Sequence, residues 1–299
     1  MHKIHGLLFP APSFNITSSI PSFLLTEIAP ISMFYIFKVA AIGIITVPLA
    51  LLTILFGFFD PYGKRVYGIS RFWAWTVLRI GGVSVEVRGL DQLSSRQPYI
   101  FMVNHQSNID IPVLVQGLSA FQLRWIAKKE LLWVPFFGWA MWAAKHLSID
   151  RSDRSDALAV LTKARQQVDQ GISIVVFPEG TRSIDGRLLP FKRGGFLLAV
   201  KTGMPIVPVT IHGTRRILPK GSWRIAQGEV EITVGAPISM EHYRPGTIRQ
   251  LATEVYGRVA QQLESTPQTA ETQTRRGGPA LAARASVENP HSLRRPWNH

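Results

Sequence analysis

Cysteine is absent from all 299 residues of the sequence, which excludes disulfide bonds, thiolate metal sites and a cysteine nucleophile. The sequence also lacks the G-x-S-x-G nucleophile elbow, the Walker A phosphate loop, the G-x-G-x-x-G dinucleotide fingerprint and the H-E-x-x-H zinc motif. Its eight histidines are scattered without the spacing of a metal site. No metal site is therefore expected, and the protein classes that these motifs define are excluded.

Acidic side chains are scarce, with 19 Asp and Glu residues against 33 Lys and Arg residues, and the formal net charge is +14. Such a balance indicates a partner surface rich in phosphate, either nucleic acid or anionic lipid. Hydrophobic residues make up 46% of the chain. That composition, at this length, predicts one sizeable α/β domain with appendages.

Charge is missing altogether from residues 39–59, a run of 21 residues that is long enough to cross a hydrocarbon core. More cations follow this run than precede it. The preceding cations are Lys3 and Lys38, and the following ones are Lys64, Arg65, Arg71 and Arg79. This asymmetry predicts that the downstream domain faces the cytoplasm at the inner membrane. A nucleic-acid binder has no use for such a run, so an anionic membrane surface is the expected partner.

Gly43 and Pro48 interrupt the uncharged run, so a bent, half-inserted helix pair is an alternative to a spanning helix, and a buried core helix is a third interpretation. Trp73 and Trp75 suit a membrane interface. We divide the chain into an unassigned segment 1–27, a membrane-associated helical segment 28–80, a catalytic domain 81–265 and a basic tail 266–299. The tail is rich in Thr, Gln, Arg and Pro without hydrophobic periodicity, which predicts disorder.

Strand and helix patterns alternate through the catalytic domain, which predicts a layered α/β fold with a mixed sheet and flanking helices. The expected strands are 83–87, 99–103, 123–127, 147–149, 172–177, 206–211 and 230–234. The expected helices are 111–117, 133–145, 157–168, 194–202 and 248–263. Pro208 interrupts its strand, which argues for an edge strand or a bulge.

A histidine and a carboxylate, His105 and Asp110, follow the apolar strand 99–103. Five residues on a regular helix would place them about 140° apart, so they meet only if the chain turns between them. A strand ending near Val103 and a helix starting near Asp110 would allow this. Asp110 would then hold one ring nitrogen and leave the other as a base. The alternative is an ordinary N-cap at Asp110 and a polar turn residue at His105.

The run Phe177–Ser183 leaves a buried strand directly and so lies at its carboxyl end, where α/β sites gather. Gly180 allows close approach of the backbone to a ligand, and Arg182 offers a planar fork suited to a phosphate monoester. Glu179 is unusual here and is expected to order Arg182 or hold a substrate hydroxyl. Lys192 adds positive charge nearby. A polar turn with a surface ion pair is the competing interpretation.

Two lysines lead into an almost wholly apolar stretch, Lys128–Trp139. This pattern suits the wall of an acyl-chain pocket or a membrane-facing surface, and core packing is equally compatible with it.

Four segments, in this order, resemble the four motifs of the glycerolipid acyltransferases. His105 and Asp110 fit the H-x-x-x-x-D motif of that family, and Lys128–Trp139 resembles its second block. Phe177–Ser183 fits its F-P-E-G-T-R-S block closely, and Val207–Val209 fits the fourth. One H-x-x-x-x-D alone is a weak signal, whereas all four blocks in order are a strong one.

The resemblance covers roughly residues 83–263 and implies transfer of an acyl group from a thioester to the sn-2 hydroxyl of 1-acyl-glycerol 3-phosphate, which gives phosphatidic acid. The implied co-substrate is acyl-CoA or an acylated carrier protein, so acyl carrier protein is a candidate partner, and no cofactor is implied. By this resemblance His105 is the general base and Asp110 fixes its tautomer. The implied acceptor-binding residues are Glu179, Gly180, Thr181 and Arg182, with Lys128 and Lys192 as weaker candidates.

Two alternatives to this function stay open at the level of sequence. The acceptor could be glycerol 3-phosphate or another lysolipid, because the spelling of the third block is a soft discriminator. A basic, membrane-anchored binding protein without catalysis is the other alternative, and the intact pair of His105 and Asp110 argues against it.

Overall fold

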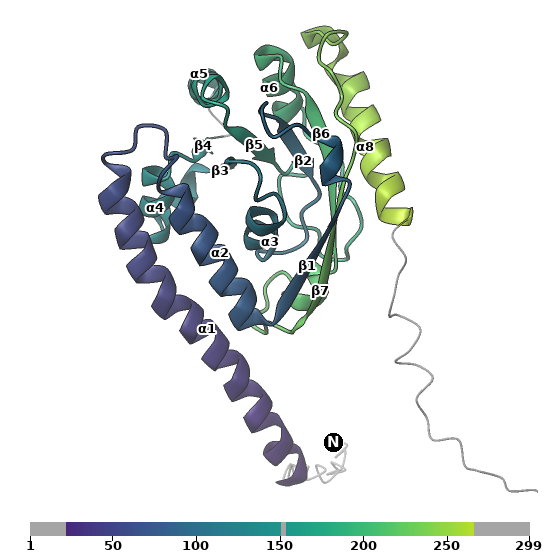
Figure 1. Ribbon diagram of the computed structural model, residues 1–299. Helices are drawn as coiled ribbons and strands as arrows, with labels where there is room; N and C mark the ends of the chain where they lie inside the picture. Colours follow the sequence, from purple (N-terminus) through teal and green to yellow (C-terminus); the bar gives the residue numbers. More distant parts are fainter. Residues whose placement is uncertain (1–21, 151–153, 266–299) are drawn as a thin grey trace, which may run out of the picture. The chain divides into compact units, whose positions relative to one another are not determined.

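The catalytic domain is built on a single seven-stranded sheet with the strand order β1-β7-β6-β2-β5-β3-β4 (Figure 1). The computed structural model describes residues 22–150 and 154–265, so the predicted disordered tail and most of segment 1–27 lie outside the described residues. The strands are β1 (Val83–Arg88), β2 (Ile100–Val103), β3 (Leu123–Lys128), β4 (Leu147–Ile149), β5 (Ser173–Val176), β6 (Ile206–His212) and β7 (Gly228–Val234). Only β6 and β7 pair antiparallel, so the sheet is mixed, as the sequence predicted.

Helices cover both faces of the sheet. The α-helices are α1 (Ser22–Gly57), α2 (Tyr67–Gly81), α3 (Asp110–Gly117), α4 (Phe137–Ala143), α5 (Arg154–Asp169), α6 (Gly194–Thr202), α7 (Thr214–Ile217) and α8 (Ile248–Ser265). Short 3-10 helices are η1 (Leu90–Gln92), η2 (Lys129–Trp133) and η3 (Pro245–Thr247). One hydrophobic core joins α2 and α3 to the sheet, and a second joins α5, α6 and α8 to its other face.

The central strand β2 explains why its sequence is apolar without interruption. Phe101 and Val103 belong to the core under α2 and α3, whereas Ile100 and Met102 belong to the core under α6 and α8. All four residues are fully buried. A strand covered on both faces has no polar side, so alternation disappears from the sequence.

Pro208 was predicted to lie in an edge strand or at a bulge, and the edge is wrong, because β6 lies inside the sheet between β7 and β2. The bulge is confirmed, because the antiparallel register shifts by one residue between the bridge Ile206–Ile238 and the pair Val209–Val234. The regular pairing of β6 with β7 ends at Val209 and Val234. Beyond that point, the backbone N–H of Gly235 donates to the carbonyl oxygen of Pro208 at 2.8 Å. The N–H that proline lacks would face this irregular stretch, so the interior strand loses no rung of its regular pairing with β7.

The predicted helix over 133–145 is shorter in the structure. Residues 129–133 form η2, and the α-helix begins only at Phe137. Pro135 lacks the backbone donor that a continuous helix needs, and Phe136 adopts a positive φ of 60°. The segment therefore folds as two short helices joined by a sharp turn.

The uncharged run is part of one continuous helix, α1, which passes through Gly43 and Pro48 without a break. Its portion Met33–Gly57 is long and apolar enough to cross a membrane. Only 11% of its most apolar window is buried, which is inconsistent with a buried core helix. Near the N-terminal end of this portion, the ammonium group of Lys38 donates to the carbonyl oxygens of Gly81 and Ile225 at 2.9 and 3.1 Å.

Candidate active site

The candidate site lies where the carboxyl ends of β2, β3 and β5 meet. These three strands are neighbours and parallel, so the residues that follow them share one edge of the sheet. The loop 104–109 connects β2 to α3 at this edge. It carries His105, and α3 begins at Asp110, as the sequence predicted.

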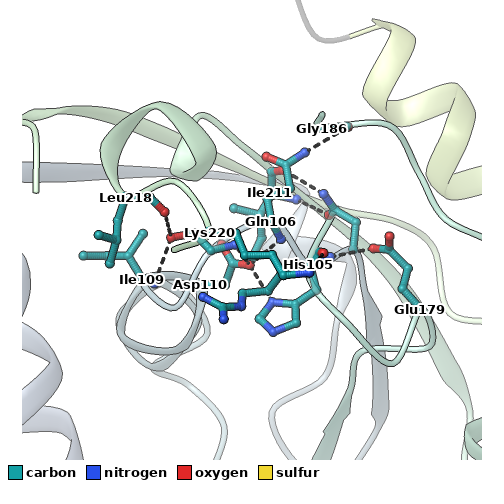
Figure 2. A network of polar contacts seen from close by, with 12 residues as sticks. His105, Gln106, Ile109, Asp110, Glu179, Gly186, Ile211, Leu218 and Lys220 are labelled. Carbon is teal, nitrogen blue, oxygen red and sulfur yellow. Dashed lines mark hydrogen bonds and ion pairs between the residues drawn. The ribbon is translucent and has the colours of Figure 1, made fainter. Parts of the chain in front are cut away.

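His105 and Asp110 form a direct pair across this turn. The distance from His105 Nδ1 to Asp110 Oδ2 is 2.8 Å, and the same oxygen accepts the backbone N–H groups of Gln106 and Ser107 at 2.8 and 2.9 Å (Figure 2). Asp110 is fully buried, and the His105 side chain is 16% exposed. A carboxylate at Nδ1 favours the tautomer that leaves Nε2 as the basic nitrogen. Asp110 therefore holds the preceding turn together and does not cap its own helix.

The loop that carries His105 is braced by the neighbouring strand β6 and the segment after it. The Asn104 side chain donates to the carbonyl oxygen of Ile211 at 3.0 Å and accepts from the backbone N–H of the same residue at 2.7 Å. The Ser107 hydroxyl donates to the carbonyl oxygen of Leu218 at 2.6 Å. Because these bonds are buried or partly buried, they fix the turn in one conformation.

The contacts of Glu179 differ from those predicted. One carboxylate oxygen accepts the backbone N–H of His105 at 2.7 Å, and the other accepts that of Leu189 at 2.9 Å. The residue is 3% exposed, and burial raises the pKa of its carboxyl group against the opposing effect of these two donors. Glu179 therefore joins the histidine loop to the loop after β5, and it neither orders Arg182 nor contacts the cavity described next.

An apolar cavity of about 680 Å³ opens beside His105. Its walls come from α1, α2, α3, α4 and the ends of β3 and β5. The predicted residues that line it are His105, Lys128, Gly180, Thr181 and Arg182. Lys192 is exposed and does not line the cavity, and its backbone N–H donates to the carbonyl oxygen of Pro178 at 2.8 Å.

The segment Lys128–Trp139 supplies both an inner and an outer surface. Leu131 and Phe137 line the cavity, whereas the side chains of Trp133 and Trp139 are 82% and 51% exposed. The interpretations as pocket wall and as outward-facing apolar surface therefore both describe parts of this segment, and core packing does not.

Sequence reasoning missed two kinds of residue at the site. Lys220 follows β6, and its ammonium group lies 3.1 Å from the carbonyl oxygen of Arg182 and 3.4 Å from the Thr181 hydroxyl. It belongs to none of the four blocks, so only the fold brings it to the Thr181–Arg182 turn. The rings of Phe177 and Trp125 were also missed as neighbours of His105, since 72 and 20 residues separate them from it in the chain.

His146 is a neutral polar group in the cavity wall. Its Nδ1 accepts the backbone N–H of Trp125 at 3.3 Å. Burial, together with the nearby positive charge of Arg124, lowers the pKa of His146 to about 3. Within residues 22–150 and 154–265, no group of three or more His, Asp or Glu side chains is placed to hold a metal ion.

Comparison with known proteins agrees with this architecture. The family model described as Acyltransferase matches residues 84–212. A 1-acyl-sn-glycerol-3-phosphate acyltransferase of Pseudomonas aeruginosa is 35% identical over 193 residues, which cover 64% of this chain and 73% of that protein. The alpha form of the sheep (Ovis aries) enzyme of the same name is 38% identical over 175 residues, or 58% of this chain and 61% of that protein.

A solved structure shares the fold. The crystal structure of the 1-acyl-sn-glycerophosphate (LPA) acyltransferase PlsC from Thermotoga maritima matches with a TM-score of 0.63 and 26% identity, covering 79% of this chain and 96% of that one. The chain belongs to the acyltransferase family of these 1-acyl-sn-glycerol-3-phosphate acyltransferases. It spans about three fifths of the length of relatives such as the sheep protein, 61% in that case.

Proposed function

We propose that the protein transfers an acyl group from a thioester to the sn-2 hydroxyl of 1-acyl-glycerol 3-phosphate and so forms phosphatidic acid. The observation that carries this proposal is a buried His–Asp pair whose imidazole opens on an apolar cavity with Arg182 in its wall. An amphiphilic acceptor needs these three features together: a base for its hydroxyl, an apolar space for its chain and a cation for its phosphate. The family membership of the chain supports the same proposal.

In the proposed mechanism His105 acts as general base through Nε2. It removes the proton of the acceptor hydroxyl while the hydroxyl oxygen attacks the thioester carbonyl carbon. The tetrahedral intermediate then collapses, the carbon–sulfur bond breaks, and the imidazolium returns the proton to the departing thiolate. Asp110, held by two backbone N–H groups, keeps the ring oriented and stabilises its positive charge. No covalent acyl-enzyme is required, and acyl-CoA or an acylated carrier protein serves as the donor.

The acceptor phosphate is proposed to bind at the mouth of the cavity. Gly180, Thr181, Arg182 and Lys128 all line the cavity. Lys220 extends over the Thr181–Arg182 turn from the segment after β6. A phosphate monoester carries nearly two negative charges at neutral pH, and it is best held by more than one cation and by the planar fork of an arginine.

Lys220 and Lys192 provide a matched pair of lysine variants. We expect Lys220→Gln to raise the KM for lysophosphatidic acid about two- to fivefold, the range of an exposed charge contact, with little effect on the donor KM. Lys192→Gln should leave both KM values unchanged, because its exposed side chain, unlike that of Lys220, has no hydrogen bond to Thr181 or Arg182. Steady-state kinetics with each substrate varied in turn checks both variants. A larger effect from Lys192 than from Lys220 would restore Lys192 to the acceptor site.

Helix α1 is proposed to lie along the membrane face of the domain rather than to cross the bilayer. Lys38 binds the domain near one end of the apolar run, and the indole N–H of Trp73 donates to Thr46 within it at 3.0 Å. At the other end the backbone of Gly57 packs against Ala143 so closely that an added Cβ would lie 2.7 Å from the Ala143 carbonyl oxygen. A helix that is held against one domain along its whole apolar length cannot cross the bilayer while that domain stays on one side of the membrane.

This arrangement predicts that both ends of the described chain lie in the cytoplasm. Topology reporters placed at the N-terminus and after Ser265 should both report a cytoplasmic location, as expected from the basic residues that follow α1. A spanning α1 would place the two reporters on opposite sides. A periplasmic or extracellular reporter after Ser265 would contradict the proposed function as well, because acyl thioester donors are cytoplasmic metabolites.

Acceptor specificity tests the proposal against its enzymatic alternatives. We expect kcat/KM to be highest for lysophosphatidic acid, lower for glycerol 3-phosphate, which leaves the apolar cavity empty, and lower for lysophosphatidylcholine, whose phosphate carries a bulky cation. Initial rates with the three acceptors and one acyl-CoA supply the comparison. A higher kcat/KM for glycerol 3-phosphate would contradict lysophosphatidic acid as the acceptor and put glycerol 3-phosphate in its place.

A further inference from the structure

Two aromatic rings, Phe177 and Trp125, are stacked beneath the candidate catalytic histidine. The His105 imidazole lies on the Phe177 ring with a centroid distance of 3.9 Å and an angle of 13° between the planes. The Phe177 ring in turn lies near the Trp125 indole, at 6.0 Å and 12°. His105 and Phe177 follow the carboxyl ends of β2 and β5, and Trp125 lies within β3; the three strands are neighbours in the sheet. The sheet itself therefore sets the spacing of the rings.

The column is anchored at its lower end. Trp125 is 7% exposed and belongs to the hydrophobic core, and its backbone N–H is bound to His146. Phe177 packs against the same core, and both residues line the cavity. The upper ring, His105, is bound at Nδ1 by Asp110 alone. A single hydrogen bond at one edge still allows the imidazole plane to rotate about that bond, whereas contact with a flat ring face does not.

We propose that Phe177 is a positioning residue for His105: its ring face fixes the plane of the imidazole and stabilises the imidazolium that forms during acyl transfer. The inference rests on the proposed role of His105 as a base. Aromatic faces attract cations within about 6 Å of the ring centroid, with an energy that rises as the site is desolvated. The imidazolium exists only after proton transfer, so this attraction acts on the transition state more than on the ground state.

The test compares three substitutions in the full chain. Phe177→Leu removes the aromatic face and keeps an apolar side chain, and it is expected to lower kcat about 3- to 30-fold with both KM values changed less than twofold. Phe177→Tyr keeps the face and should retain most of kcat. Phe191→Leu is the control, because Phe191 belongs to the core under α6 and α8 and does not line the cavity. The midpoint of the acidic limb of the kcat/KM profile should move to lower pH in Phe177→Leu only.

A second measurement needs no activity. In NMR spectra of protein that is isotopically labelled at the histidine rings, the signals that disappear in His105→Ala belong to His105. Stacking on Phe177 should shift these signals upfield, and Phe177→Leu should remove the shift. If Phe177→Leu does not fold, Phe177→Met replaces it in both experiments.

The outcomes separate the two proposals. Unchanged kcat and an unmoved acidic limb in a folded Phe177→Leu variant would overturn the role of Phe177, and so would the absence of an upfield shift in the unsubstituted protein. Equal losses in Phe177→Leu and Phe177→Tyr would do the same. If His105→Ala instead remains active while the ring shift is present, it is the proposed function that fails.

Discussion

Replacement of His105 by alanine is expected to lower kcat by about 10²–10⁴-fold while the protein stays folded, because general base catalysis typically contributes that much. The imidazole is the group at the cavity wall whose free nitrogen can take the proton of a hydroxyl. Asp110 would keep two backbone N–H partners in the variant, so the buried carboxylate stays partly satisfied. Thermal melting and circular dichroism verify the fold, and initial rates give kcat.

His242→Ala is the matched control, because His242 is exposed and does not line the cavity, and it should keep normal turnover. Asp110→Asn should lose activity mainly in kcat and retain some of it, since an amide can still orient the ring but carries no charge to stabilise the imidazolium. Near-normal turnover of a folded His105→Ala protein would show that another group activates the acceptor.

Removal of the Arg182 side chain is expected to raise the KM for lysophosphatidic acid by about 10- to 100-fold and to leave the donor KM nearly unchanged. A bidentate contact between a guanidinium and a phosphate contributes roughly 1.5–3 kcal/mol, which corresponds to that range. Arg182→Lys should recover only part of the affinity, because the ammonium group keeps the charge and loses the fork. Kinetics with each substrate varied in turn measures both effects.

Arg187→Ala is the control for charge alone. Arg187 lies five residues further along the same loop, its side chain is 89% exposed, and it pairs with Asp185 at 3.7 Å. We expect its removal to change neither KM. Equal increases in the two KM values for Arg182→Ala would instead assign Arg182 a structural role and leave the acceptor phosphate to Lys128 and Lys220.

The sequence predicted what depends on local pattern. Fully apolar runs marked the buried strands, and the break between Val103 and Asp110 was deducible because the two side chains could not meet on a helix. Pro208 was assigned to an edge strand or a bulge because local sequence shows the missing donor but not where in the sheet the strand lies. The helix over 133–145 was overextended because its apolar composition outweighed the single proline at position 135 in the prediction.

Contacts between distant segments were beyond the sequence. Glu179 follows a strand and precedes Arg182, so proximity along the chain suggested that it binds Arg182 or substrate, whereas the fold brings two backbone N–H groups to its carboxylate. The same limit left Lys220 out of the prediction, because it is 38 residues from Arg182 in the chain and close to it only in space. The stack of Phe177 on His105 has the same origin, since strand order decides which strand ends are neighbours.

Mass spectrometry of the lipid product tests the central claim most directly. The purified protein is incubated in detergent or vesicles with isotopically labelled 1-acyl-glycerol 3-phosphate and either acyl-CoA or an acylated carrier protein. We predict labelled phosphatidic acid whose new acyl chain is at the sn-2 position, release of one free thiol for each product molecule, and loss of both signals in His105→Ala. Recovery of unchanged lysophosphatidic acid with both donors, from a folded protein, would contradict the account.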